Sequence, residues 1–426
     1  MDELKPAPRQ LLQELFQTAV DAAHPELTLP ATLPQPPKGR TVVIGAGKGA
    51  AQLAKTFEHH WSGPFEGFVV TRYGFGVPCD RFEVVEAAHP IPVVAGEKAA
   101  ERMLSMVQGL REDDLVIALV CGGGSALLPM PPDGFTLEDE QLLCRALLQS
   151  GMPIRGMNAV RKHFSGIKGG RLAQAAAPAR VVSLVVSDVP GDDPSEVASG
   201  PPVPGSATRA EALAWIARYD LNLPEQLEQA IATAPEAPRP DDPVFARNTV
   251  SLLASANRSL EAAADLARSR GLPAVILSDS MEGEARELGR VSATIAGEVA
   301  TKNRPFKSPI VLLSGGEATV TLRQNGRGGP NGEFILALAL SLKGVSGITA
   351  LAADTDGIDG SEDNAGAFAD AGTISRIREA GQDPQELLDR NDSWTAFQAA
   401  DDLFTPGPTG TNVNDFRAIL IDTCKV

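Results

Sequence analysis

Five apolar runs along the chain each end in glycine or an acidic residue. They read TVVIGAGKGA (41–50), DLVIALVCGGGSA (114–126), ARVVSLVVSDVPGDDP (179–194), SPIVLLSGGEATV (308–320) and GITALAADTDGIDG (347–360). A short run of β-forming residues bounded by glycine or aspartate is typical of a buried parallel strand. Because ligands of open α/β sheets bind beyond the carboxyl ends of such strands, the pattern predicts a ligand site built from these ends.

Strand and helix patterns alternate between and around these runs. In the first half we expect helices at 8–23, 48–60, 94–109, 136–150, 157–176, 207–218 and 224–233, and strands at 41–45, 66–71, 82–86, 114–120 and 180–187. A segment rich in proline and aspartate, 234–248, interrupts the alternation. Beyond it we expect strands at 249–255, 273–278, 309–314, 317–322, 347–353 and 416–422, and helices at 258–270, 284–302 and 333–343. The alternation predicts two α/β domains, 1–240 and 241–426.

Composition and charge narrow the classes of function. Of the 426 residues, 43% are hydrophobic and 22% are charged, as in an ordinary globular protein. The net charge of −16 argues against binding to nucleic acid or to an anionic membrane, and it requires a local cationic pocket for any anionic substrate. The four cysteines lack metal-binding spacing, and neither a signal peptide nor a run of 18 apolar residues is present. We therefore expect a cytoplasmic protein that spans no membrane.

The first run ends in a turn with three glycines, Gly45, Gly47 and Gly49, around Lys48. The turn matches the loose dinucleotide fingerprint, but the second strand ends at Thr71-Arg72, without the acid that binds a ribose. It is not a Walker A loop either, because Gly-Lys-Ser/Thr is absent. A lysine at the predicted start of a helix suits an anionic ligand. The alternative is a plain turn with a solvated lysine.

Two further segments carry candidate anion-binding groups. The second run is followed by Gly122, Gly123, Gly124 and Ser125. Their successive backbone N–H groups suit a phosphate or a carboxylate, although a close-packed turn explains three glycines equally well. The segment 157–176 is basic, and on a helix one of its faces would carry Asn158, Arg161, Ser165 and Lys168. The alternative there is a solvated charged face.

Carboxylates at two strand ends are candidate ligands for a hard cation. Asp188 follows the third run and Asp356 follows the fifth. Mg²⁺ takes one or two carboxylates and completes its shell with water and phosphate oxygens, whereas a lone aspartate at a strand end is also a common turn residue. The glycine-rich loop 326–333 carries Arg327, whose planar guanidinium suits a phosphate or carboxylate. Glycine loops and carboxylates at strand ends together predict a nucleotide, Mg²⁺ and phosphoryl transfer.

Taken in order, these motifs resemble the bacterial type of glycerate 2-kinase, a family with an N-terminal DUF4147 domain and a C-terminal MOFRL domain. The matching segments are VIGAGKGA (43–50), CGGGSALL (121–128), MNAVRKHFSGIKGGRLA (157–173), SDVPGDDPSEVASGPP (187–202), LLSGGEATVT (312–321), GRGGPNGEF (326–334), ADTDGIDG (353–360) and TGTNVND (409–415). They span nearly the whole chain in the family's order. The resemblance implies two α/β domains, the first Rossmann-like with a largely parallel sheet, and an active site in the cleft between them.

The resemblance also implies the reaction: ATP phosphorylates the 2-hydroxyl of D-glycerate, with a divalent metal such as Mg²⁺, to give 2-phosphoglycerate. Lys48 resembles the family's active-site lysine and Arg327 its second-domain arginine. Asp188 is the third catalytic candidate, and Asp188 and Asp356 are alternatives for binding Mg²⁺ or accepting the hydroxyl proton. The expected substrate- and nucleotide-binding residues are Gly45, Gly47, Gly49, Gly122, Gly123, Gly124, Ser125, Asn158, Arg161, Lys168, Gly315, Gly316 and Glu317.

Two other functions remain as alternatives. Proteins similar to this family are also named hydroxypyruvate reductases of tartrate degradation, which use NAD(P)H. The missing ribose-binding acid argues against that activity, while Arg72 leaves an NADPH-dependent form open. A non-catalytic ligand-binding protein is the third alternative, and the charged strand ends in both halves count against it. The expected partner is D-glycerate, without nucleic acid or membrane, and a homodimer is the candidate assembly.

Overall fold

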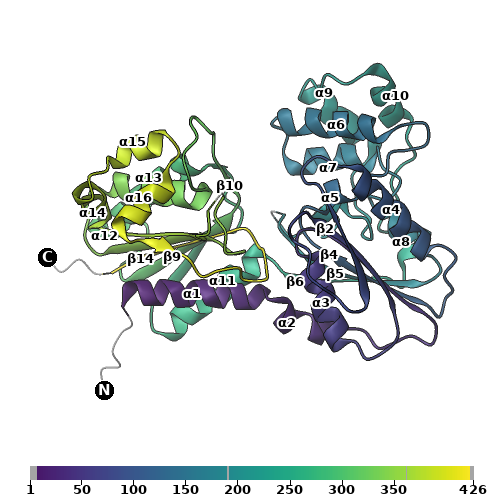
Figure 1. Ribbon diagram of the computed structural model, residues 1–426, viewed down its shortest axis with the longest axis horizontal. Helices are drawn as coiled ribbons and strands as arrows, with labels where there is room; N and C mark the ends of the chain where they lie inside the picture. Colours follow the sequence, from purple (N-terminus) through teal and green to yellow (C-terminus); the bar gives the residue numbers. More distant parts are fainter. Residues whose placement is uncertain (1–6, 190, 361, 423–426) are drawn as a thin grey trace. The chain divides into compact units, whose positions relative to one another are not determined.

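The computed structural model describes residues 7–189, 191–360 and 362–422, which form two compact α/β units (Figure 1). The first unit comprises residues 25–253, and the second comprises residues from 254 onward together with the N-terminal segment through His24. Two α/β units confirm the predicted fold class. Their bounds differ from the predicted division into 1–240 and 241–426, because the first unit begins at residue 25 and ends at residue 253.

The first unit contains a six-stranded sheet in the order β3-β2-β1-β4-β5-β6. Its strands are β1 (Thr41–Ala46), β2 (Glu66–Arg72), β3 (Phe82–Ala87), β4 (Leu115–Val120), β5 (Arg180–Val186) and β6 (Thr249–Ala254). The pairs β2–β3, β1–β2, β1–β4 and β4–β5 are parallel. Every residue of β1 and β4 is buried, as expected for parallel strands covered on both faces. The largely parallel, Rossmann-like sheet is therefore confirmed, and β6 joins it rather than beginning the second domain.

Helices cover this sheet and form a separate helical cluster. The helical segments of the unit are α2 (Pro25–Thr28), η1 (Pro30–Thr32), α3 (Ala50–His60), α4 (Val94–Val107), α5 (Gly124–Leu127), α6 (Leu137–Gln149), α7 (Ile154–Lys162), α8 (Arg171–Ala175), η2 (Val197–Ser199), α9 (Arg209–Arg218), α10 (Glu225–Thr233) and η3 (Pro243–Phe245). Helices α4 and α8 pack on the sheet through apolar residues such as Met103 and Leu172. Helices α6, α7, α9 and α10 pack on one another around Leu147, Val160 and Ile216.

The prediction of one basic helix over 157–176 is wrong. Helix α7 ends at Lys162 and α8 begins at Arg171. Gly169 and Gly170 between them adopt φ values of +63° and +86°, which interrupt a right-handed helix and which residues with a side chain rarely adopt. The predicted shared face is therefore lost, because Ser165 and Lys168 lie outside α7.

The second unit has a mixed sheet in the order β13-β12-β11-β14-β9-β7. Its strands are β7 (Ala274–Ser278), β9 (Ile310–Gly316), β11 (Ile348–Asp354), β12 (Gly366–Asp370), β13 (Leu403–Phe404) and β14 (Asp415–Ile421). Only β7–β9 is a parallel pair among the pairs of this sheet that the structure describes. The fourth and fifth apolar runs are thus not adjacent parallel strands, because β14 lies between them in the opposite direction. The predicted strand 317–322 is reduced to β10 (Ala318–Thr319), paired with β8 (Gly283–Glu284).

Helices cover both faces of this second sheet (Figure 1). Helices α1 (Pro8–Ala23) and α11 (Ala256–Ser269) lie on one face, and α12 (Ala285–Lys302), α13 (Pro330–Leu342), α14 (Thr373–Glu379), α15 (Pro384–Asp389) and α16 (Ser393–Ala400) lie on the other. Phe16 of α1 contacts Phe404 and Phe416 edge-to-face, at centroid distances of 5.0 and 5.7 Å. This apolar contact places α1 in the second unit instead of the predicted 1–240 domain. None of the helices in the described ranges has both the length and the apolar character of a membrane span.

Candidate active site

The order of the first sheet reverses between β1 and β4. From β1 the chain adds β2 and β3 on one side, whereas β4 and β5 extend the other side. The crevice outside such a reversal is where open α/β sheets bind ligands. The Lys48 turn follows β1 and the Gly122 loop follows β4, and the backbone N–H of Lys48 donates to the carbonyl of Gly122 at 2.8 Å. Two glycine loops predicted separately are thus adjacent at this point.

Close packing explains two of the glycines in the Lys48 turn. A Cβ on Gly45 would lie 2.8 Å from the carbonyl oxygen of Leu119, and one on Gly47 would collide with the carbonyl of Cys121. Gly47 also adopts a φ of +134°. Both glycines allow β1 and its turn to approach β4. By themselves they do not identify a phosphate site.

Three titratable side chains surround the Gly122–Gly123 loop. Gly123 has a φ of +78°, and a Cβ there would lie 3.1 Å from Cγ of Lys48 and 3.4 Å from Cδ2 of His89. A Cβ on Gly122 would overlap the carboxylate of Asp188. Burial raises the pKa of Asp188 above its ordinary value, and the positive charge of Lys48 opposes part of that rise. The structure therefore brings the predicted Lys48, Gly122, Gly123 and Asp188 together.

His89 belongs to this group but is absent from the predicted site residues. It lies two residues after β3, whose last residue, Ala87, pairs with Arg72 at the end of β2. Burial lowers the pKa of His89 to about 4, and the positive charges of Lys48, Arg72 and Arg161 contribute to the same shift. His89 is thus a neutral imidazole at pH 7 on which three positive charges act. A single histidine forms no recognisable sequence motif. The one signal that could have identified it is its position shortly after the predicted strand 82–86.

A hydrogen-bond network centred on Asn158 extends the site. The Oδ1 atom of Asn158 accepts from Oγ of Ser199 at 2.8 Å and from Nη1 of Arg161 at 3.3 Å, while its Nδ2 donates to Oε2 of Glu196 at 3.0 Å. The hydroxyl of Ser199 also shares a short hydrogen bond with that of Ser125. Asn158 thereby connects the predicted residues Arg161 and Ser125. Ser199 and Glu196 are missing from the predicted set, although both lie inside the SDVPGDDPSEVASGPP motif.

Lys168 is held by a buried ion pair. Its Nζ lies 2.9 Å from Oε1 of Glu140 and donates to the carbonyl of Leu128 at 2.8 Å, and the residue is 1% exposed. Lys168 lines a small pocket together with Ser125 and Arg161. Glu140 offsets the charge of Lys168, and the predicted substrate contact of Lys168 stays a prediction.

In the second unit, two predicted strand ends flank the first residue of β14. Asp415 pairs with Gly316 of β9 on one side and with Asp354 of β11 on the other. Burial, with the charges of Asp356 and Asp415, raises the pKa of Asp354 well above its ordinary value. Asp356 accepts hydrogen bonds from the Ile358 N–H at 2.9 Å and from Nδ2 of Asn412 at 3.3 Å. The Gly315–Glu317 segment and Asp356 therefore approach the same edge of the sheet although the strands alternate in direction.

Arg327 and Asp359 lie near the start of α13. The exposed guanidinium of Arg327 stacks 3.9 Å above the ring of Trp394 and donates to Oγ1 of Thr395 at 3.1 Å. Within the described ranges, no carboxylate forms an ion pair with Arg327. Asp359 accepts from the N–H groups of Asn331 and Gly332 at 2.9 and 2.7 Å, and burial raises its pKa to about 7.

The chain is similar to known proteins over nearly its whole length. The family DUF4147, described as a domain of unknown function, matches residues 11–232, and the MOFRL family matches residues 310–415. A protein of Agrobacterium vitis with the provisional name hydroxypyruvate reductase is 50% identical over 416 residues, which cover 97% of this chain and 94% of that protein. The D-glycerate 2-kinase of Thermotoga maritima is 39% identical over 415 residues, covering 97% and 98% of the two chains. The crystal structure of a T. maritima glycerate kinase matches with a TM-score of 0.86 and 38% identity, over 97% of this chain and 99% of that one.

Proposed function

Because the chain belongs to the family that joins a DUF4147 domain to a MOFRL domain, we propose that it is a D-glycerate 2-kinase. The reaction moves the γ-phosphoryl group of ATP to the C2 hydroxyl of D-glycerate and yields ADP and 2-phosphoglycerate. One observation carries the proposal: the positive charges of Lys48, Arg72 and Arg161 all act on a neutral, buried His89, in a protein whose net charge is −16. Such a local cationic site suits two anionic substrates.

Lys48 has the position expected of a phosphate-binding cation. Phosphoryl transfer depends mainly on positioning and on neutralising charge over the phosphate oxygens. Lys48 precedes α3, whose N-cap residue Gly49 brings no side chain to the first turn. The positive end of the helix and the lysine therefore favour the same anion. We assign Lys48 to the transferred phosphoryl group and the Gly122–Gly124 loop to the nucleotide phosphates.

Arg161 is our candidate for the glycerate carboxylate. Its guanidinium is planar and permanently charged, which suits two hydrogen bonds to a carboxylate. Its Nη1 donates a hydrogen bond to Oδ1 of Asn158 at 3.3 Å, and Arg161 and Ser125 line the same small pocket. Lys168, neutralised by Glu140, supports the wall of that pocket.

His89 is suited to accept the proton of the C2 hydroxyl. A general base must be unprotonated before the reaction, and burial together with the nearby cations keeps His89 neutral by lowering its pKa. Two bound anions would offset those cations and raise the pKa of His89 toward the range of an efficient base. Burial shifts the pKa of Asp188 upward instead, and we therefore assign the two groups at the loop distinct roles.

Asp188 fits a single-carboxylate Mg²⁺ site. Its buried charge is costly, as its raised pKa indicates, and a neighbouring cation would offset that cost. One carboxylate suffices, because Mg²⁺ usually takes its other oxygens from water and substrate phosphates. Mg²⁺ supplies charge neutralisation on the phosphates when bound. Asp356 stays a second candidate, although both of its carboxylate oxygens already accept protein hydrogen bonds.

Arg327 is proposed as a further catalytic cation. The assignment rests on the family resemblance of its loop and on its exposed guanidinium. The guanidinium stacks on the ring of Trp394 and forms no ion pair with a carboxylate in the described ranges. An Arg327→Ala variant that keeps normal turnover of glycerate would remove it from the proposal.

A coupled assay tests the function. ADP release is measured with D-glycerate, ATP and Mg²⁺, beside the oxidation of NADH and NADPH with hydroxypyruvate. Enolase consumes 2-phosphoglycerate directly, so an enolase signal without a mutase supports the 2-kinase. Oxidation of NADPH without ADP release would overturn the proposal and favour the reductase, with Arg72 placed for a ribose 2′-phosphate.

A further inference from the structure

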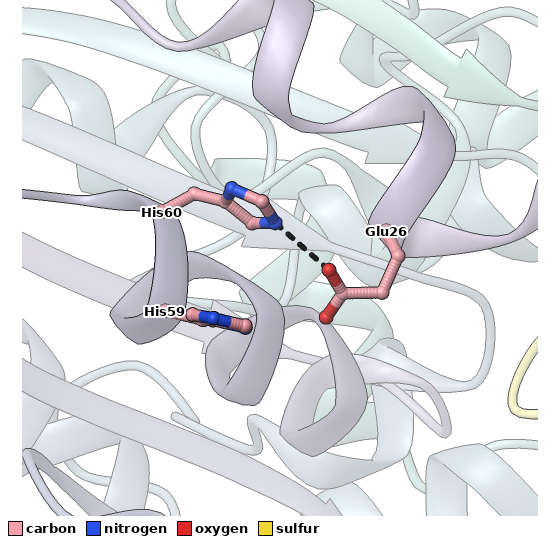
Figure 2. Close-up of side chains that lie close together, drawn as sticks. All are labelled: Glu26, His59 and His60. Carbon is pink, nitrogen blue, oxygen red and sulfur yellow. Dashed lines mark hydrogen bonds and ion pairs between the residues drawn. The ribbon is translucent and has the colours of Figure 1, made fainter.

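Three metal-binding side chains converge on the surface of the first unit (Figure 2). Glu26 belongs to α2, and His59 and His60 are the last two residues of α3. One ligand atom from each side chain lies within 4.8 Å of the others, and Nε2 of His60 lies 2.8 Å from Oε2 of Glu26. Within residues 7–189, 191–360 and 362–422, no other set of three histidine, cysteine or acidic side chains is so compact.

The arrangement contains more than a surface ion pair. A Glu–His pair needs one histidine, and successive residues of a helix point about 100° apart. The rings of His59 and His60 nevertheless stack at 29° with centroids 5.0 Å apart, and both extend from α3 toward Glu26 in Figure 2. The hydrogen bond between Nε2 of His60 and Oε2 of Glu26 joins this histidine pair to the carboxylate.

We propose that Glu26, His59 and His60 bind a divalent transition-metal ion of the zinc class. Two imidazoles and one carboxylate form a ligand set that Zn²⁺ accepts, with water in the open position. Mg²⁺ and Ca²⁺ prefer oxygen ligands and are poor candidates here. The side chains of His60 and Glu26 are 33% and 41% exposed, so rotation about their own bonds can bring the ligands to coordination distance.

This site is separate from the proposed catalytic site. Lys48 precedes α3, and the two histidines end it. The 11 residues of α3 span about 16 Å at the helical rise, so the ion would not touch the reacting groups. Pro25, at the start of α2, is the first residue after the chain leaves the second unit. A bound ion would therefore link α2, the first helix after the chain leaves the second unit, to the last turn of α3.

Titration of metal-free protein tests the proposal. We expect Zn²⁺ to bind one equivalent in calorimetry at micromolar protein, and Co²⁺ to give the visible absorption of a site with nitrogen ligands. His59→Ala, His60→Ala and Glu26→Gln should each weaken binding at least about tenfold. His24→Gln and Asp80→Asn remove a nearby histidine and an exposed carboxylate outside the cluster, and they should bind as the unaltered protein does.

Thermal unfolding adds an independent measurement. A ligand that binds only the folded state raises the unfolding midpoint. Zn²⁺ should raise the midpoint of the unaltered protein and of both control variants but not that of the three site variants. Midpoints measured without metal verify that every variant folds. Absence of binding, or binding that the combined His59→Ala and His60→Ala substitutions leave unchanged, would overturn the proposal. Neither outcome depends on kinase activity.

Discussion

Lys48, His89 and Asp188 lie around one loop, and the positive charge of Lys48 acts on both of the other groups. Lys48 favours the ionised form of Asp188 and disfavours a protonated His89. Burial acts against charge on both groups, so Asp188 is shifted upward and His89 downward in pKa. Groups with pKa values displaced in opposite directions are frequent at catalytic sites. An anion that binds at this loop would change the charge balance of all three groups. Single substitutions can separate the proposed roles of phosphate binding, general base and Mg²⁺ ligand.

Replacing Lys48 tests the phosphate-binding role. Lys48→Met keeps an apolar side chain of similar length but removes the charge that would neutralise the transferred group. We expect kcat for ADP release to fall by about 10²- to 10³-fold, as for loss of a transition-state hydrogen-bond donor. Lys55→Met is the matched control, because Lys55 lies on α3 and its half-exposed side chain pairs with Glu58. Near-normal turnover of Lys48→Met would disprove the assignment.

The lowered pKa of His89 predicts how stability depends on pH. The pKa in the folded protein is about 4, below the value of about 6.5 in an unfolded chain. Between these values the unfolded state binds the proton and the folded state does not, so acid favours unfolding. The contribution of His89 to stability is complete above about pH 6.5 and is lost as the pH falls toward 4.

His89→Gln removes this titration and retains an uncharged polar side chain. We expect the thermal midpoint of the unaltered protein to fall more than that of His89→Gln as the pH is lowered from about 6.5 to 4.5. Parallel curves for the two proteins would contradict the shift. As a general base His89 should also contribute about 10²-fold to kcat, which the same variant measures at pH 7.5.

At the level of elements, strands with continuous apolar sequence were predictable and their directions were not. LVIALV in β4 is a buried strand in either direction, so its pattern identifies the element alone. In the second unit β14 inserts between β9 and β11 and makes both neighbours antiparallel. That pairing joins strands far apart in the sequence, which local periodicity does not encode.

The candidate site shows the same limit. Loops after β1, β4 and β5 were predictable because glycine and aspartate follow apolar runs. Lys168 was placed on a helix face with Arg161, because the positive φ values of Gly169 and Gly170 are not visible in a helical pattern. His89 and Ser199 were missed because each enters the site through tertiary contacts.

Gly122→Ala tests how closely the β4 loop is fitted to the β5 end. The added methyl group would overlap the carboxylate of Asp188 and force it away from the loop. A displacement of about 1 Å in an active site can cost about 10²-fold in rate, and we expect that order of loss in kcat with the fold retained. In Gly297→Ala, by contrast, the methyl group meets nothing within 4 Å on helix α12. That control should keep full activity, and equal activity of Gly122→Ala would refute the close contact.

At the level of the whole chain, the order of the sequence and the division into units differ. The DUF4147 match begins at residue 11, inside α1, yet α1 packs on the sheet of the second unit. Its amphipathic pattern predicts a helix with one apolar face, but it does not predict which surface this face covers. The chain thus enters the second unit, forms the first unit and returns at residue 254. The first sheet takes strands from both sides of the predicted boundary between 240 and 241, because β6 joins it. The strands of the second sheet all follow that boundary, but helix α1, which covers one of its faces, precedes it.

Phe16→Ala tests this division of the chain. Phe16 is 1% exposed and contacts Phe404 and Phe416, so its truncation should cost about 3–5 kcal/mol of unfolding free energy. Because the lost contacts all lie in the second unit, limited proteolysis should become faster within 254–422 while 25–253 stays resistant. Gln13→Ala, on the exposed face of α1, should cleave at the unaltered rate. Faster cleavage within 25–253 instead would mean that α1 stabilises the unit whose sequence it precedes, as the order of the chain alone predicts.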